Sequence, residues 1–194
     1  MSPETGPVVP IAFFKRTAPE VARDLLGAVL VSHCGGARTA GRIVETEAYL
    51  GVDDPASHAY RGRRHSGNES IYASPGTWYV YRSYGVHWCA NLVTAPRGSG
   101  SAVLIRGLAP QSGLDAMRRR RRPDGTVIAD SSLCDGPGKL TQALAITRAL
   151  DGTLMTEAEV VVEWGPTRTA KQFETTRRVG ITRAADRLLR FVVC

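Results

Sequence analysis

Two glutamates that could exchange protons with a substrate lie in the β-prone stretch Glu45-Thr-Glu47-Ala-Tyr49-Leu-Gly51. Alternate residues of a strand point to one face, so we expect Glu45 and Glu47 to share a face. Two carboxylates there repel each other, and burial of either raises its pKa toward that of a general acid or base. The alternative is an exposed strand face, because glutamate is mostly found in solvent.

Tyrosine and tryptophan are concentrated over a short stretch that follows. The stretch contains Trp78, Tyr79, Tyr81, Tyr84 and Trp88. Rings interleaved with Arg82, and near the arginines of residues 61–64, are typical of base stacking combined with phosphate contact. An aromatic core strand is the alternative, and it is favoured for Trp78 and Trp88. Tyr84 falls near the expected bend, where a core residue is harder to justify.

Motifs of the common cofactor and metal sites are absent. No GxGxxG follows a predicted strand, and neither GxxxxGK[ST] nor GxSxG occurs. The histidines do not have HExxH or Cys2His2 spacing, and the zinc-deaminase pattern is missing. The cysteines lie far apart, at Cys34, Cys89, Cys134 and Cys194. We therefore expect no metal, no organic cofactor and free thiols in a reducing compartment.

Composition is that of an ordinary globular protein with a basic excess. The chain has 194 residues, with 25 Lys and Arg against 18 Asp and Glu. The consecutive arginines Arg118–Arg122 carry most of the +7 net charge, so the charge permits a polyanionic partner without identifying one. No apolar run approaches the length of about 20 residues that spans a bilayer. The N-terminus lacks the plan of a secretory signal, and we expect a cytoplasmic protein.

Patterning along the chain predicts one mixed α+β domain after a loose arm over residues 1–10. Helices are predicted over 17–26, 111–121 and about 136–146, and strands over 28–34, 38–50, 77–84, 86–94, 102–108, 160–163 and 188–193. A Pro-Asp-Gly turn is predicted within residues 122–132. The polar connection over 51–76 is long enough to indicate a function.

Several motifs, in order, resemble the alkyladenine (3-methyladenine) DNA glycosylase family. They are Gly41-Arg-Ile-Val-Glu-Thr-Glu-Ala-Tyr-Leu-Gly51, Pro75-Gly-Thr-Trp-Tyr-Val-Tyr-Arg-Ser-Tyr-Gly85, Cys89-Ala-Asn91, Val103-Leu-Ile-Arg106, Gly136-Pro-Gly-Lys-Leu140, Arg178-Val-Gly-Ile181 and Leu189-Arg-Phe191. The resemblance covers roughly residues 11–193. It implies a single glycosylase domain over 11–194, with a curved, mainly antiparallel sheet, a protruding hairpin and surrounding helices.

Such enzymes flip a damaged purine out of duplex DNA and hydrolyse its N-glycosidic bond without a covalent enzyme intermediate. The resemblance implies that Glu47 is the general base that activates water for attack on C1′ of the sugar. It also implies that Arg106 and the carbonyl of Val179 hold that water. Glu45 then has a structural role.

The same resemblance assigns the base pocket to Tyr49, His58 and Tyr81, which would sandwich the flipped base. Electron-rich rings suit alkylated purines that carry positive charge. Asn91 is the implied residue at the pocket floor that disfavours normal guanine. Tyr84 is the implied wedge that fills the gap left in the duplex.

Phosphate contacts are expected from basic residues and from one helix start. The candidates are Arg61, Arg63, Arg64, Arg82, Gly138 and Lys139. An ordinary helix cap by Asp135 is the alternative at the helix start. No role is assigned to Arg118–Arg122. None of the lysines, Lys15, Lys139 and Lys171, lies in the glutamate–tyrosine cluster, which argues against a lyase.

The sequence therefore predicts a monofunctional DNA glycosylase of base excision repair. Its substrate would be double-stranded DNA with an alkylated or deaminated purine, of the class of 3-methyladenine, 7-methylguanine, hypoxanthine and ethenoadenine. A monomer without membrane contact is expected, associated with the nucleoid during repair. A non-catalytic module that recognises damage or shape is the main alternative, and an RNA-modifying hydrolase stays open.

Overall fold

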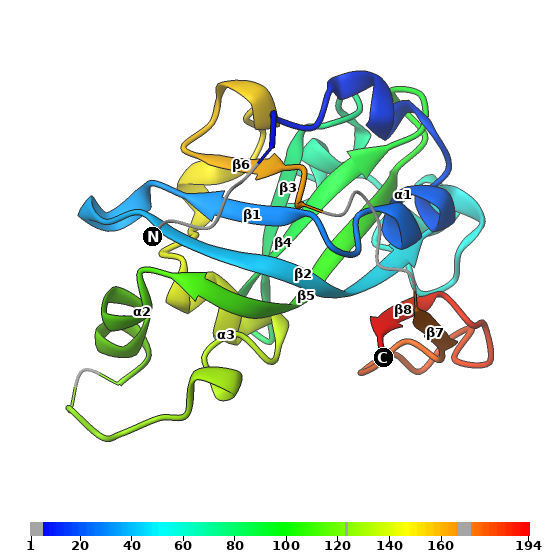
Figure 1. The fold of residues 1–194 in the computed structure, drawn as a ribbon. Coiled ribbons are helices and arrows are strands. Elements are labelled where there is room, and N and C mark those ends of the chain that lie inside the picture. The colour runs from blue at the N-terminus through cyan, green and yellow to red at the C-terminus, as the bar shows by residue number, and fades with distance from the viewer. Residues whose placement is uncertain (1–5, 123, 167–171) are drawn as a thin grey trace.

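The sheet and helices are seen in a computed structural model that describes residues 6–122, 124–166 and 172–194 (Figure 1). The strands are β1 (Val29–Ser32), β2 (Thr39–Tyr49), β3 (Trp78–Ser83), β4 (His87–Thr94), β5 (Ser101–Ser112), β6 (Val160–Glu163), β7 (Phe173–Thr176) and β8 (Arg190–Val193). The α-helices are α1 (Ala18–Asp24), α2 (Leu114–Arg121) and α3 (Pro137–Ala143). The fold is mixed α+β, as the sequence predicts.

Strand β2 is the axis of the sheet, whose order is β3-β4-β5-β2-β1-β6 with every pairing antiparallel. One edge of β2 pairs with β5 along its length, with register shifts around Glu45. The other edge is shared, because β1 pairs with residues 39–42 and β8 pairs with residues 45–47. The part of β2 that carries both glutamates is thus held between β5 and β8.

Local signals account for several elements. The N–H of Thr17 donates to the Glu20 carboxylate (3.1 Å), which caps α1, and Gly27 follows the helix with a φ of +91°. Strands β1 and β2 form the predicted hairpin, as do β3 and β4. Strand β5 runs on to Ser112, so α2 begins at Leu114 rather than at residue 111. Helix α3 ends at Ala143, before the predicted residue 146.

Two predicted segments turn out differently or fall outside the structure. The loose arm predicted over residues 1–10 is not seen for residues 6–10, because the N–H of Gly6 donates to Trp164 O (2.7 Å) and Val9 is fully buried. Apolar packing of Val9 explains this difference. Residues 1–5 of that arm, and Pro123 of the predicted Pro-Asp-Gly turn, lie outside the described residues.

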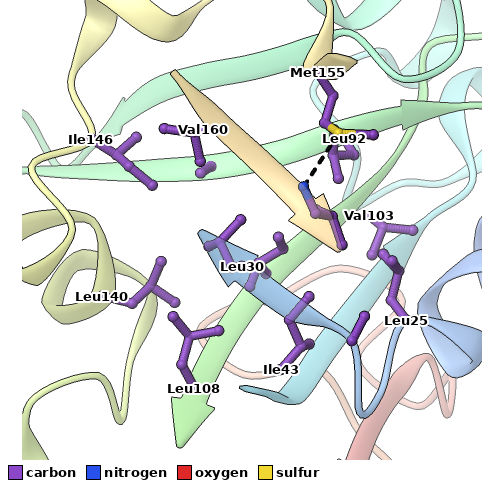
Figure 2. Packing of buried hydrophobic residues seen from close by; sticks show 14 of the residues in the cluster. Leu25, Leu30, Ile43, Leu92, Val103, Leu108, Leu140, Ile146, Met155 and Val160 are labelled. Atoms are coloured by element: carbon purple, nitrogen blue, oxygen red, sulfur yellow. Dashed lines mark hydrogen bonds between the residues drawn. The ribbon is translucent and has the colours of Figure 1, made fainter. Parts of the chain in front are cut away.

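Apolar side chains from the sheet and the surrounding helices form one main cluster (Figure 2). Helix α1 packs against β2 and β5, and α3 packs against β4 and β5. Leu25, Leu30, Ile43, Leu92 and Leu140 are all fully buried within it. This core makes β2, β4 and β5 a rigid platform for the side chains on their other face.

Candidate active site

Glu47 lies near the end of β2 with only 1% of its surface exposed. Its Oε1 accepts a hydrogen bond from the backbone N–H of Val179 (2.9 Å), and its Oε2 accepts one from the Tyr49 hydroxyl (2.8 Å). Burial raises the pKa of this carboxyl, while the Val179 N–H, Arg106 and Tyr49 each oppose the rise. A buried carboxylate with a raised pKa is suited to take up a proton.

Glu45 and Glu47 do share one face of β2, as their spacing predicts. Nε of Arg106 lies 2.9 Å from Glu45 Oε1 and 3.0 Å from Glu47 Oε1. Neither contact has hydrogen-bond alignment, so Arg106 forms an ion pair shared by the two carboxylates. Glu45 is also bound by Arg190 of β8, whose Nε lies 2.5 Å from Oε1. With two arginine partners, Glu45 joins β8 and β5 to β2.

A cavity of about 660 Å³ opens over this face of the sheet. It brings together side chains that are spread widely along the chain. Its lining includes Glu47, Tyr49, His58, Tyr81, Tyr84, Asn91, Arg106 and Val179. These are the residues that the resemblance assigns to catalysis, the base pocket and the wedge. The volume is in the usual range of small-molecule sites.

One wall of the cavity is aromatic. The His58 and Tyr81 rings meet edge to face with centroids 4.4 Å apart, and Tyr79 stacks on Tyr81 at 5.4 Å. Nδ1 of His58 lies 2.6 Å from the Tyr79 hydroxyl. Burial, with positive charge from His65 and Arg63, lowers the pKa of His58, which favours a neutral imidazole. Tyr79 is among the rings that the sequence groups for base stacking but has no role assigned by the resemblance, although its hydroxyl contacts the His58 ring.

Asn91 of β4 is buried beside this wall. Its Nδ2 donates to Tyr79 O (3.0 Å) and Cys89 O (3.4 Å). Both acceptors are backbone carbonyls of the β3–β4 hairpin, so the amide orientation is set by the sheet. Asn91 therefore presents a fixed shape to the cavity.

Tyr84 lies at the tip of the β3–β4 hairpin with 89% of its surface exposed. The turn is closed by the Val86 N–H, which donates to Ser83 O (3.0 Å). Tyr84 and Gly85 both have positive φ, +49° and +68°. Positive φ is unfavourable for a side chain as large as tyrosine. The Tyr84 ring therefore contributes nothing to the hydrophobic core, and packing does not explain a tyrosine at this strained position.

The candidate phosphate ligands are in different settings. Arg64 is engaged by Glu69 and lies over the Tyr72 ring, and Arg61 lies over Tyr60. Arg63 and Arg82, both exposed, line a second cavity that shares the wall of His58, Tyr79 and Tyr81 with the first. Arg82 lines the first cavity as well.

At the start of α3, the alternative of a helix cap by Asp135 is not seen. Gly136, not Asp135, is the N-cap, and Asp135 pairs with Lys139 (2.9 Å). A Cβ on Gly138 would lie 2.6 Å from Cβ of His87, so glycine is required there for packing of α3 on the hairpin. These contacts give structural reasons for residues that were expected at a phosphate.

The run Arg118–Arg122 is largely committed to protein partners. Arg120 donates to the carbonyls of Ala143 (2.9 Å) and Cys34 (2.9 Å). Arg121 donates to Leu133 O, and Arg118 pairs with Asp115 and Asp130. These arginines tie α2 to neighbouring segments. Arg118, Arg120 and Arg121 thus have partners within the protein.

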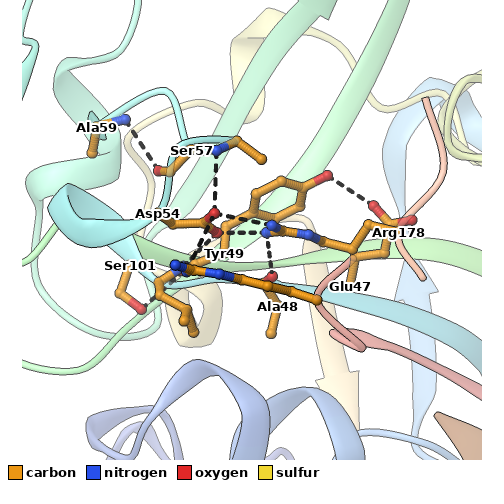
Figure 3. Close-up of polar contacts among 11 residues, drawn as sticks. Glu47, Ala48, Tyr49, Asp54, Ser57, Ala59, Ser101 and Arg178 are labelled. Atoms are coloured by element: carbon orange, nitrogen blue, oxygen red, sulfur yellow. Dashed lines mark hydrogen bonds and ion pairs between the residues drawn. The ribbon is translucent and has the colours of Figure 1, made fainter. Parts of the chain in front are cut away.

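Sequence reasoning missed a buried ion pair beside the glutamate. The Arg178 and Asp54 side chains are both fully buried, and Arg178 Nη2 donates to Asp54 Oδ1 (2.9 Å) (Figure 3). Arg178 lies in a motif of the resemblance, and Asp54 lies in the long polar connection. No pattern in the sequence relates two residues that are 124 positions apart.

The described ranges hold no group of three or more His, Cys, Asp or Glu side chains that could bind a metal ion. The four cysteines are free thiols. Within the described part of the chain, no helix is both long and apolar enough to cross a membrane.

Comparison with known proteins shows matches over nearly the whole chain. Residues 12–194 match the family model of methylpurine-DNA glycosylase (MPG). A protein of Methanoculleus marisnigri is 48% identical over 186 residues, which are 94% of this chain and 93% of that protein. Proteins of Agrobacterium fabrum and Rhodopseudomonas palustris are 45% and 47% identical, covering 98% and 97% of this chain and 91% and 86% of their own. All three are named "Putative 3-methyladenine DNA glycosylase".

Proposed function

We propose a base-flipping mechanism for this chain. The chain belongs to the methylpurine-DNA glycosylase family and is a hydrolase of N-glycosyl bonds in DNA that contains damaged bases. The chain acts on double-stranded DNA with an alkylated or deaminated purine, of the class of 3-methyladenine, 7-methylguanine, hypoxanthine and ethenoadenine. The observation that carries the proposal is the buried Glu47 carboxylate, 1% exposed, on the wall of a cavity lined by aromatic rings.

The bond-breaking step is carried by a water activated by Glu47. As the bond from the purine nitrogen to C1′ lengthens, positive charge develops on the sugar, and the ionised carboxylate stabilises it. The water oxygen bonds to C1′, its proton passes to Glu47, and the bonding pair leaves with the base. A cationic methylpurine then departs as a neutral molecule, whereas hypoxanthine or ethenoadenine departs as an anion that takes a proton from solvent. An abasic site is left in either case.

Arg106 and Val179 position this water. The Arg106 guanidinium lies against both carboxylates, and the Val179 backbone is held next to Glu47 by its own N–H. The Val179 carbonyl therefore has a fixed position, and it accepts a hydrogen bond from the water. A water that is already positioned loses less translational and rotational entropy on reaching the transition state than a water from bulk solvent.

The flipped base lies between Tyr49 on one side and the wall of His58 and Tyr81 on the other. Burial keeps the Tyr49 and Tyr81 phenols neutral by raising their pKa values, so both rings stay electron-rich without charge. Such rings attract a cationic purine more strongly than a neutral one. Asn91, fixed by two backbone carbonyls, crowds the 2-amino group of guanine.

Tyr84 occupies the gap that the extruded nucleotide leaves in the stack. Unstacking a base costs a few kcal/mol, and a ring inserted in its place offsets part of that. The strained tip of the hairpin already presents the ring to solvent before DNA binds. No rearrangement of the protein is then needed for insertion.

Arg63 and Arg82 contact phosphates next to the extruded nucleotide. They line the second cavity, which shares an aromatic wall with the base pocket. Arg64 is instead paired with Glu69. Arg61 contributes more weakly from the exposed loop, and Lys139, beside Gly138, exchanges Asp135 for a phosphate. Duplex binding is therefore strongly dependent on salt.

The chain acts as a monofunctional glycosylase rather than as a lyase or a binding module. Among the described residues, no lysine lines the main cavity, so no amine nucleophile is at hand. A module that only binds DNA gains nothing from a buried carboxylate that faces a polyanion.

Incubation of the purified chain with a panel of duplexes, each with one defined lesion, tests the proposal. We expect release of at least one alkylated or deaminated purine, and strand breakage only after alkali. Borohydride should trap no covalent complex. Release of no base from any duplex of the panel would refute the function, and a trapped complex would refute the mechanism.

A further inference from the structure

The buried pair of Arg178 and Asp54 touches three segments that form the candidate site. Nη1 of Arg178 donates to Asp54 Oδ2 (2.5 Å) and to the carbonyl of Ala48 (3.0 Å), and Nη2 donates to Asp54 Oδ1 (2.9 Å). Ala48 lies between Glu47 and Tyr49 on β2 (Figure 3). One guanidinium therefore joins the strand of the glutamate to the polar connection and to the 178–181 segment.

Asp54 organises the turn that precedes His58. Its Oδ2 accepts the N–H of Leu50 (3.1 Å), and its Oδ1 accepts the N–H of Ala56 (3.1 Å). Burial by itself would raise the pKa of Asp54, but Arg178 and these two amides hold it below its ordinary value. The carboxylate is thus saturated by donors and keeps residues 50–56 in one conformation.

Arg178 holds both groups that donate to Glu47. Its neighbour in the chain is Val179, whose N–H binds Glu47 Oε1. Its guanidinium carbon lies 4.7 Å from the centroid of the Tyr49 ring, and the hydroxyl of that ring binds Glu47 Oε2. Arg178 thus contacts the ring of one donor and is joined through the backbone to the other.

Stability alone is a weak reason for this arrangement. Buried ion pairs are often no more stabilising than apolar residues of similar volume. Nε of Arg178 is also buried without a hydrogen-bond partner. The guanidinium thus fixes the positions of Ala48 and Asp54, while one of its own nitrogens has no hydrogen-bond partner.

We propose that Arg178 and Asp54 are positioning residues that hold the Val179 N–H and the Tyr49 hydroxyl on Glu47 and couple the glutamate to the His58 turn. The proposal rests on the proposed function, because it assigns a role in aiming the same carboxylate. The pair acts only through other residues and does not reach the cavity, whose lining includes neither side chain.

Single-turnover excision from a lesion duplex, measured across pH, tests this proposal with Arg178→Lys. Lysine keeps the charge but cannot make the two parallel bonds to Asp54 and the bond to Ala48 at once. We expect the plateau rate to fall at least about tenfold and the acid limb to move to higher pH, because Glu47 loses donors that favour its ionised form. The dissociation constant for the lesion duplex should stay within about twofold, since the pair contacts no DNA.

Arg120→Lys is the matched control. Arg120 is also a structural arginine that donates to carbonyls, but those carbonyls, of Ala143 and Cys34, belong to no part of the cavity. This variant should melt at a lower temperature and keep the wild-type acid limb. Asp54→Asn is a second variant in the pair and should move the limb in the same direction as Arg178→Lys.

The possible outcomes separate the two proposals. A wild-type chain that excises no lesion refutes the proposed function, and the positioning role with it. An active wild type whose pair variants keep the wild-type acid limb refutes the positioning role alone. The same limb shift in Arg120→Lys, or loss of folding in both pair variants while Arg120→Lys folds, also refutes it, because the pair is then only structural.

Discussion

The backbone N–H of Val179 donates a 2.9 Å hydrogen bond to Oε1 of Glu47, across 132 positions of sequence. The bond brings the last part of the chain onto the central strand of the sheet, where β8 also pairs with residues 45–47. A buried carboxylate is costly unless such donors surround it. The C-terminal segment therefore completes a site whose other members come from β2, β3, β4, β5, the polar connection over 51–76 and the β3–β4 turn.

The pH dependence of excision should follow the ionisation of Glu47. Its pKa is raised by burial, and the active form is the carboxylate, so the rate should rise with pH and reach a plateau. Tyr49→Phe removes a donor that favours the ionised form, and the acid limb should then move to higher pH. Single-turnover rates across pH test this, and an unmoved limb in Tyr49→Phe would show that the limb belongs to another group.

The free energy of unfolding should also depend on the ionisation of Glu47, but this contribution falls as pH rises, whereas the excision rate increases. A carboxyl whose folded pKa is raised stabilises the fold at low pH, and this stability is lost as pH rises through the folded pKa. At neutral pH, Glu47→Gln should therefore be at least as stable as the wild type. Denaturant unfolding at several pH values should show the wild type gaining on the variant as pH falls. A variant less stable by the same amount at every pH would contradict the raised pKa.

Replacement of Tyr84 by glycine should separate stability from DNA binding. The ring is 89% exposed at a φ of +49°, so Tyr84→Gly removes strain without loss of buried contacts. We expect an unchanged or higher melting temperature and an affinity for lesion duplex that falls about tenfold. Excision from single strands should change less, and equal losses on both substrates would argue against a wedge.

Salt titrations should distinguish the two arginines Arg82 and Arg64. Each phosphate contact adds about 0.9 to the slope of log affinity against log salt for duplex DNA. Arg82→Ala should lower the slope by about one such contact. Arg64→Ala is the control, because Arg64 is already paired with Glu69. Equal changes in the two variants would mean that an arginine in the second cavity contacts phosphate no more than Arg64 does.

Local features of the fold could be predicted because their causes are local. Thr17 and Glu20 mark the start of α1, and the glycines at positions 35, 36 and 85 mark the two hairpin turns. The shared face of Glu45 and Glu47 follows from strand alternation, and both carboxylates do reach Arg106. Strand β7 was not predicted, since Phe173–Thr176 is short, largely polar and stabilised as a strand by pairing with β8.

The long-range polar partners could not be predicted in the same way. Asp54 stands in a polar loop and Arg178 in a polar tail, and neither position implies full burial. Arg120 looks like part of a solvated basic run, yet its partners are carbonyls of segments that only the tertiary fold brings near. Composition records the charge of such residues, whereas their role depends on which unpaired groups the fold places beside them.

The variant Glu47→Gln, assayed on a duplex with one excisable lesion, shows whether the buried Glu47 performs the chemistry. Excision should fall by about a thousandfold or more, while the affinity for the duplex stays within a few-fold of wild type. Glu45→Gln is the matched control on the same face, and it should retain much more activity because Glu45 already has two arginine partners. Base release by Glu47→Gln at close to the wild-type rate would mean that Glu47 is not the general base.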